Sequence, residues 1–218
     1  MSDAEAPPGR TRKRRSTARR SASRLPPEAR RTQLLAVASE LLEAGGVDAL
    51  QMTELASAAG VTRPVAYRFF PNRRALILAL MEDFELALEE RFLKASGRLL
   101  GGTVAEAAAL FVRAVCDTIE VKGAGAWNLL DSGGPDPEIA RVGGEIQAKM
   151  LEPWRPHIQQ ATGASEREVE TVARMLVAAG RAVLARWLDG TLSRDEAIRD
   201  ATRGISGLLM AFSGGGPR

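Results

Sequence analysis

Apolar residues recur every three or four positions through most of the chain after residue 30. The first such segment ends at the pair Gly45-Gly46, and its apolar positions are Leu34, Leu35, Ala38, Leu41 and Leu42. This spacing gathers the apolar side chains on one face of a helix, and glycine is typical just after a helix C-terminus. The pattern therefore predicts a first helix from about Arg30 to that glycine pair.

Two short apolar segments follow, at residues 52–59 and 63–70. Gly60 between them suits a sharp turn, Thr62 is placed to cap the second of the two helices, and Pro64 is tolerated in its first turn. Two brief helices joined by a glycine turn, behind a longer helix, form the outline of a helix-turn-helix.

The rest of the chain also has helical periodicity. Asn72 can cap a long helix that runs to about Leu99, a short helix is expected around Trp127, and another covers residues 138–151 before Pro153 and Pro156 kink or break it. Three capping boxes begin further helices: Thr103 with Glu106, Ser165 with Glu168, and Ser193 with Glu196. No segment alternates convincingly like a strand, so the sequence predicts an all-α protein of about nine helices.

The last two predicted helices, residues 165–188 and 193–213, each have an apolar seam that needs a partner. In the second of them the apolar spacing is close to that of a coiled coil. Small residues that permit close helix approach accompany both seams: Ala178, Ala179, Gly180, Gly204 and Gly207.

Composition and charge narrow the class of protein. The 218 residues are 45% hydrophobic and 26% charged, as in a soluble globular protein. A single cysteine, the lack of a signal-peptide pattern and the lack of a long apolar run predict a cytoplasmic protein with no membrane partner. Residues 1–31 carry ten of the 30 Lys and Arg residues but three of the 27 Asp and Glu residues. We therefore expect residues 1–26 to be a disordered basic arm, which either meets a polyanion or only aids solubility.

The residue types present give little support for an enzyme. His157 and Cys116 are the single histidine and cysteine, so no metal cluster of the usual kind and no Cys-His pair is expected, and no phosphate-binding loop is evident. The carboxylates lie on the polar faces of predicted helices. His157 is expected at the surface and Cys116 as a buried, inert thiol. The sequence predicts a non-enzyme without a metal or cofactor.

The run ELASAAGVTRPVAYRFFPNRRALILAL, at residues 54–80, closely resembles the helix-turn-helix of the TetR family of transcriptional regulators. The resemblance covers about residues 30–80. Its features are Leu55-Ala56, Gly60-Val61, Tyr67, Phe70, Arg73 and Leu76.

This resemblance implies roles for individual residues in binding double-stranded DNA. In a helix-turn-helix, the N-terminal part of the second helix reaches base edges in the major groove. The family pattern implies that Thr62, Arg63, Pro64 and Val65 face bases and that Tyr67 and Arg73 contact phosphates. Arg68 can read guanine or hold phosphate. Gln51 stands where the family often has Ser or Thr capping the second helix, and Thr53 is expected to make the phosphate contact at that helix end in its place. Phe69 stands where histidine or tyrosine is common.

The resemblance also implies an organisation for the whole chain. A DNA-binding domain at residues 27–75 would follow the arm, and residues 76–218 would bind a small-molecule effector and form a homodimer through residues 165–188 and 193–213. Side chains of this kind at helical spacing more often belong to a plain core, and the candidate pocket residues among them are Phe84, Phe111, Trp127, Met150 and Trp154. The predicted function is a sequence-specific regulator, a repressor released by an effector, that binds an imperfect palindrome.

Two alternative functions remain open at this point. One is a non-specific architectural DNA-binding protein whose affinity comes from the basic arm. The other is a helical adaptor or an enzyme in which the basic segment is incidental.

Overall fold

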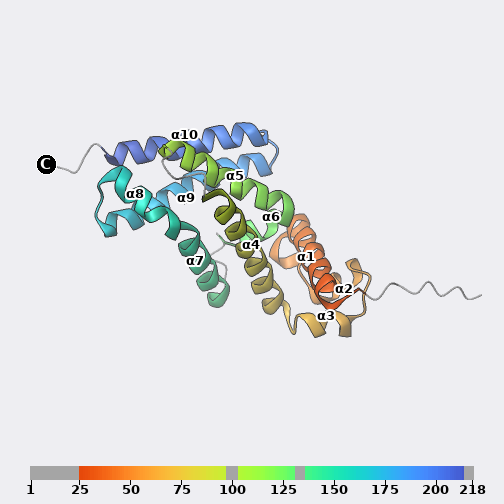
Figure 1. Cartoon of the computed structure of the whole chain (residues 1–218). Coiled ribbons are helices and arrows are strands. Elements are labelled where there is room, and N and C mark those ends of the chain that lie inside the picture. Colours follow the sequence, from red (N-terminus) through yellow and green to blue (C-terminus); the bar gives the residue numbers. More distant parts are fainter. Residues whose placement is uncertain (1–24, 97–102, 131–135, 214–218) are drawn as a thin grey trace, which may run out of the picture.

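The computed structural model describes residues 25–96, 103–130 and 136–213, and these residues form ten α-helices, one short 3-10 helix and no strand (Figure 1). The elements in chain order are α1 (Pro27–Ala49), α2 (Met52–Ala58), α3 (Arg63–Phe69), α4 (Arg73–Ser96), α5 (Val104–Lys122), α6 (Ala124–Leu129), α7 (Pro137–Leu151), η1 (Glu152–Trp154), α8 (Arg155–Thr162), α9 (Glu166–Leu188) and α10 (Arg194–Ser213). The all-α prediction is confirmed. The basic arm and Leu99 lie outside the described residues, apart from Leu25 and Pro26.

Helices α1 to α3 form one end of the molecule. The backbone of α1 leaves helical geometry at Gly45 and Gly46, where the sequence predicts the end of the first helix. Gly60 turns the chain between α2 and α3 with a φ of 63°, a conformation that glycine adopts without steric cost. Leu34, Leu55, Ala66 and Phe70 are buried where the three helices meet.

Helix α4 connects this end to the rest of the molecule, and in Figure 1 it runs from the α3 end towards α5. Its apolar residues recur every four positions and are buried, with Leu76, Leu80, Phe84, Leu88 and Phe92 all at most 9% exposed. A single hydrophobic cluster extends from Leu34 in α1 to Leu209 in α10. Helix α4 is therefore joined to both ends of the molecule by packed apolar side chains.

Helices α5, α9 and α10 pack together at the opposite end from α3, with α8 beside α9 and α10, and α7 packs along α4 (Figure 1). The capping boxes fix where these helices begin. The N–H of Thr103 donates to the Glu106 carboxylate at 2.7 Å, and the N–H of Ser193 donates to Glu196 at 2.8 Å. Ser165 and Glu168 make the same contact at 2.8 Å. The Asn72 side chain likewise accepts from the N–H of Ala75 at 2.9 Å at the start of α4.

The segment with Pro153 and Pro156 differs from the sequence expectation. Instead of ending helical structure, it forms η1 and then α8, because Pro156 lies in the first turn of α8, where a missing backbone N–H costs nothing. Gly163 ends α8 with a φ of 68°. Helix α8 is the element that the count of about nine helices leaves out.

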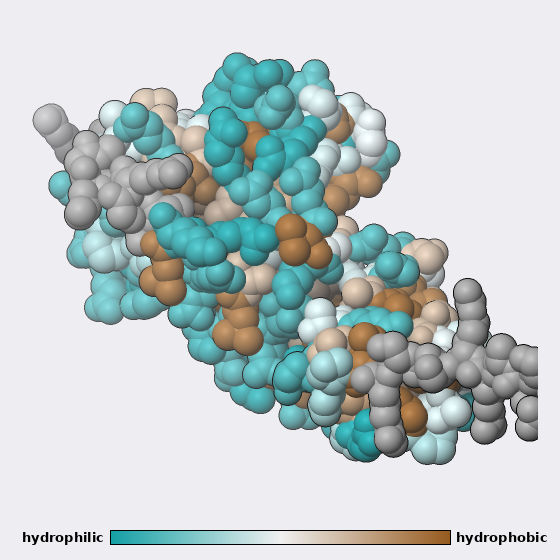
Figure 2. All heavy atoms as spheres, turned by 45° about the vertical axis from the view of Figure 1, so that its right-hand side comes forward, coloured by the Kyte–Doolittle hydropathy of each residue, from teal (hydrophilic) through white to brown (hydrophobic). Residues whose placement is uncertain are grey.

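The described helices include no segment long and apolar enough to cross a membrane. Figure 2 shows one face of the molecule, where hydrophobic residues form separate patches on a largely hydrophilic surface.

Candidate DNA-binding surface and ligand cavity

One side of α3 is open to solvent. Thr62, Arg63, Pro64, Tyr67 and Arg68 are exposed, and Tyr67 is 47% exposed. Val65 is half-buried. The structure therefore brings the predicted base-facing and phosphate-facing residues together on a single exposed surface, which we call the α3 face.

The other side of α3 anchors it to α1 and α2. Ala66 is fully buried, and Phe70 is 2% exposed, as expected for a residue that closes the three-helix core. The guanidinium of Arg31 lies 5.8 Å from the centre of the Phe70 ring, and that of Arg68 lies 5.3 Å from the Phe69 ring. The Phe69 ring thus contacts the Arg68 guanidinium on the α3 face, although phenylalanine lacks the polar group that is common at this position in the family.

The expected caps at the two short helices are absent. Neither Gln51 nor Thr62 makes a side-chain hydrogen bond to the helix that it precedes. Gln51 Nε2 donates instead to the Asp48 carbonyl oxygen at 3.1 Å. Thr53, which is expected to make the phosphate contact in place of Gln51, is the second residue inside α2 and is half-buried there.

Arg73 and Arg74, at the start of α4, both have partners within the protein. Arg73 donates to the Val47 carbonyl oxygen and lies 3.7 Å from the Asp48 carboxylate, so it holds the turn between α1 and α2. Arg74 Nε donates to Asp136 at 2.7 Å, and its NH1 lies 3.4 Å from Glu138. These contacts were not expected from the sequence, and the second pair joins the three-helix end to α7.

Asp136 serves two structural purposes at once. It caps α7 by accepting from the N–H groups of Glu138 and Ile139 at 3.0 and 3.4 Å, and it accepts from Arg74. Burial acts to raise the pKa of Asp136, but the hydrogen bond from Arg74 and the two backbone N–H groups outweigh it and lower that pKa below its ordinary value. The carboxylate is therefore charged, and the link to Arg74 is formed, at neutral pH.

Helix α1 is joined to the turn between α5 and α6. Ser39 donates to the Lys122 carbonyl oxygen at 2.8 Å, and the Glu43 carboxylate accepts from the N–H of Ala124 at 2.6 Å. Gly123 lies between them with a φ of 84°, and a Cβ there would lie 2.2 Å from the Glu43 carboxylate. The position thus requires glycine, and the three-helix end is fixed to the remainder at a second place.

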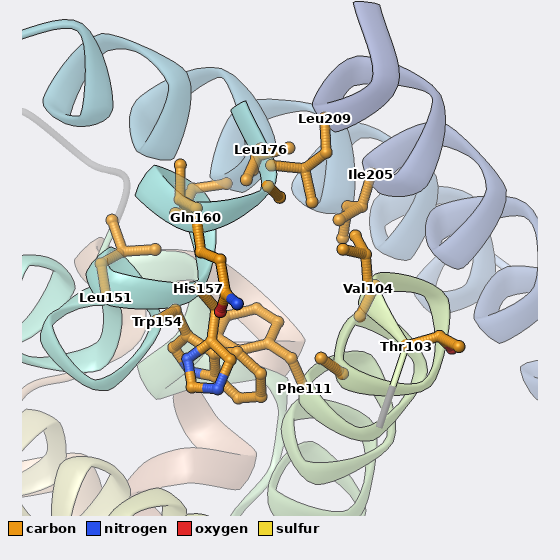
Figure 3. A pocket seen from close by; sticks show the side chains of 15 residues that line it. Thr103, Val104, Phe111, Leu151, Trp154, His157, Gln160, Leu176, Ile205 and Leu209 are labelled. Carbon is orange, nitrogen blue, oxygen red and sulfur yellow. The ribbon is translucent and has the colours of Figure 1, made fainter. Parts of the chain in front are cut away.

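A cavity of about 350 Å³ lies among α5, α8, α9 and α10 (Figure 3). Of the five candidate pocket residues, Phe111 and Trp154 line it. Trp127 and Met150 line a small void of about 20 Å³ that adjoins it. Phe84 does not line the cavity, because it is fully buried in the core with its ring 6.1 Å from that of Trp127.

The sequence reasoning missed the part of the cavity wall that α8 supplies. His157, Ile158, Gln160 and Ala161 all line the cavity, and His157 and Gln160 are exposed at its edge. The sequence does contain a signal for α8. Proline is common at the start of a helix, and Gly163, six residues after His157, can end one. His157 is at the surface, as expected.

Residues suited to catalysis or metal binding are scarce in the described part of the chain. Cys116 is fully buried, and burial raises the pKa of its thiol to about 11. Within residues 25–96, 103–130 and 136–213, no group of three or more His, Cys, Asp or Glu side chains is placed to hold a metal ion.

Comparisons with known proteins agree with the shape of the three-helix end. Residues 34–80 match the family described as bacterial regulatory proteins, tetR family. A 70-residue stretch is 41% identical to the transcriptional activator FasR of Mycolicibacterium smegmatis, and this stretch is 32% of each chain. The match therefore spans about a third of that relative.

Solved structures resemble the fold over most of the chain. A putative TetR-family regulator from Rhodococcus sp. gives a TM-score of 0.67 over 83% of this chain and 99% of that one, at 19% identity. The fatty acid degradation regulator FadR from Bacillus halodurans gives 0.62 over 85% and 95%, at 17% identity. At such low identity the likeness concerns the fold alone.

Proposed function

Because the chain belongs to the TetR family of bacterial regulatory proteins, with its helix-turn-helix at residues 34–80, we propose that it is a sequence-specific DNA-binding regulator of transcription. The α3 face is the observation that carries this proposal. It presents two arginines, a tyrosine hydroxyl and a threonine hydroxyl from a short helix whose opposite side is buried. The family is one of regulators, which agrees with the non-enzymatic prediction.

The exposed side chains divide into base-reading and positioning roles. Arg63, in the first turn of α3, can donate two hydrogen bonds to guanine, and Thr62, Pro64 and Val65 lie beside it at the end of the helix that enters the groove. Tyr67 and Arg68, one turn further on, bond phosphates and fix the register. Arg73 contributes its charge next to this surface while it holds the α1–α2 turn. Thr53, half-buried in α2, is the least accessible of the proposed contacts.

We further propose that residues 27–75 form the DNA-binding domain and that the following helices bind an effector in the cavity among α5, α8, α9 and α10. Effector binding would shift α7 and α8 relative to α4, and the shift would reach the DNA-binding end through Arg74 and through the contact of α1 with Gly123. A two-state change of this kind alters the spacing of two DNA-binding ends. We propose that it lowers DNA affinity and so relieves repression, although the relative from M. smegmatis is named an activator.

Homodimer formation through α9 and α10 is part of the same proposal. Gly204 and Gly207 face solvent, and a Cβ at either would meet no atom within 4 Å. Glycine inside a helix costs about 1 kcal/mol relative to alanine, so two such residues on an outer face favour close approach by a second copy. Met175 and Met210 are 41% and 68% exposed on these helices. Gly180 is buried and packs within the chain, 3.9 Å from Ile205.

Measuring the affinity for duplex DNA tests this function against the architectural alternative. We would compare the full-length protein, a version without residues 1–26, and the double variant Arg63→Ala/Arg68→Ala. Arg113→Ala/Arg141→Ala is the matched control, since both arginines are exposed and lie on α5 and α7, outside α3 and outside the helices of the proposed dimer. We expect the α3 variant to lose most of the affinity and the control to keep it. Loss of all binding on removal of the arm, with no effect of the α3 variant, would instead identify an architectural protein.

A further inference from the structure

The cavity among α5, α8, α9 and α10 is unusual in its lack of charge. None of the described residues that line it is Lys, Arg, Asp or Glu. Most of its wall is aliphatic, with Val104, Leu151, Leu176, Ile205 and Leu209 among the contributors. Moving an unpaired charge into such a space is strongly unfavourable, because the charge loses its hydration and finds no opposite charge.

Three of the polar groups of the cavity lie together on one side, and the fourth, the Thr103 hydroxyl, lies near Val104 at the start of α5. Figure 3 shows Trp154, His157 and Gln160 grouped on the side of η1 and α8, whereas Val104, Ile205 and Leu209 lie across from them. His157 and Gln160 are exposed, and so are Thr103 and Val104 at the start of α5, so the cavity meets solvent between α8 and the start of α5. The indole N–H of Trp154 is buried and has no hydrogen-bond partner within the described residues. The cavity thus offers hydrogen bonds at its edge and apolar contact elsewhere.

The aromatic rings in the wall are already engaged with one another. The rings of Phe111 and Trp154 meet edge to face, with their centres 5.4 Å apart and their planes at 88°. Phe92 stacks on Phe111 at 5.3 Å. These rings form a packed cluster rather than two parallel plates, so the cavity has no slot for a flat aromatic ligand.

A second, smaller void adjoins the cavity on its inner side. The void of about 20 Å³ shares Phe111, Leu176, Val177 and Ile205 with it, and its far side includes Gly180. The two spaces are separated by side chains that they share, and displacement of those side chains would lengthen the cavity towards α9. A linear chain would use that length better than a compact molecule would.

We propose that the cavity binds an uncharged aliphatic amphiphile, such as a fatty alcohol, ester or amide, with its chain inside and its neutral polar group beside His157 and Gln160. The inference that this ligand regulates DNA binding rests on the proposed function, whereas its chemical class is inferred from the cavity alone. A carboxylate or an ammonium on the same chain would be disfavoured for want of a counter-charge.

Calorimetric titration of the full-length protein with matched probes tests the chemical class. The probes are decanol, methyl decanoate, decanoate and decyltrimethylammonium, at about pH 8, where the carboxylate is ionised. We expect both neutral probes to bind at least about ten-fold more tightly than either ion, and affinity to rise about three- to four-fold per methylene from octanol to decanol. Equal or tighter binding of either ion, or no dependence on chain length, would overturn the proposal.

Two variants locate the ligand. Ala161→Phe places a ring in the cavity and is expected to abolish binding of decanol, whereas Ala58→Phe, the same change at an exposed site on α2, is expected to leave it unchanged. Gly180→Ala narrows the inner void at a position where the new Cβ lies 3.9 Å from Ile205 Cδ1. Because alanine also favours the helix, this variant should fold, keep its affinity for octanol and lose the gain from octanol to decanol. Unchanged binding in both cavity variants would place the ligand elsewhere.

Repeating the titrations with the DNA-bound protein separates this inference from the proposed function. Neutral probes that bind as expected but leave DNA affinity unchanged would refute the effector role and leave the ligand class intact. Release of DNA by an ion but not by the neutral probes would refute the ligand class and support the effector role.

Discussion

Arg63 and Tyr67 lie on the same short helix, but their chemistry suits different parts of a DNA duplex. A guanidinium in the first turn of α3 can donate two parallel hydrogen bonds to one guanine, which no other base accepts in the same geometry. A tyrosine hydroxyl one turn later offers a single donor, which any phosphate accepts. Ala66 and Phe70 are buried, and their burial orients α3 so that Arg63 and Tyr67 are exposed.

We expect Arg63→Ala to weaken binding by about 1 to 3 kcal/mol and to relax the preference at one base pair, because one base-specific contact is lost. Tyr67→Phe should weaken binding by about the same factor on every DNA sequence. Affinities for the preferred duplex and its single-base substitutions distinguish the two. If both variants lose affinity equally on all duplexes, Arg63 does not read a base.

The Cys116 thiol should not react in the folded protein. Burial raises its pKa to about 11, so the thiolate is scarce at neutral pH, and no solvent reaches the sulfur. Its raised pKa also means that the folded state is favoured below the ordinary thiol pKa and loses this advantage as pH rises towards 11. Titration with a chromogenic disulfide at about pH 8 should show labelling only after denaturant is added. Rapid labelling of the native protein would contradict the burial.

At the scale of elements, local signals specify the helix boundaries well. Capping boxes at Thr103, Ser165 and Ser193 predict three starts that the structure confirms. Helix α8 was missed because proline has opposite effects inside a helix and in its first turn, and the sequence around Pro156 allows both. The partners of Arg73 and Arg74 lie 26 and 62 residues away along the chain, so no local pattern predicts them.

The contact of Arg74 with Asp136 and Glu138 should compete with DNA for the guanidinium. In the variant Asp136→Asn/Glu138→Gln, asparagine keeps the cap of α7 but the counter-charges are lost. We expect DNA affinity to rise, and the dependence of log affinity on log salt to steepen by about one, because one more arginine reaches a phosphate.

Adding Arg74→Ala to that variant should cancel the gain. An unchanged salt dependence would show that Arg74 serves only to join α4 to α7. Because the pKa of Asp136 is lowered, the contact is present above the ordinary Asp pKa and is lost as pH falls through the lower, folded value. The competition is therefore fully active at neutral pH.

At the scale of the molecule, α3 and the pair α9–α10 lie at opposite ends, joined by α4 (Figure 1). A dimer through α9 and α10 would leave both α3 faces free to occupy successive major grooves, which is the geometry that a palindromic site requires. Sequence periodicity indicated an unpartnered seam on these helices, but it did not show which small residues face outward. Only the structure separates the outward Gly204 and Gly207 from the inward Gly180.

We expect Gly207→Arg to convert the dimer to a monomer without unfolding it, because the Cβ meets no atom within 4 Å in the single chain and glycine is the poorer helix former. Gly144→Arg, at an equally open and exposed glycine on α7, is the matched control and should remain a dimer. Sedimentation analysis gives the mass of each variant. A dimeric Gly207→Arg protein would place the interface elsewhere.

Selection of bound duplexes from a random DNA pool, at near-physiological salt, tests the central claim most directly. The full-length protein and the version without residues 1–26 should both enrich the same imperfect palindrome, with half-sites about one helical turn or a multiple apart. Retention of duplexes without a shared motif, and only by the full-length protein, would show that the basic arm is the binding element and that α3 does not read DNA.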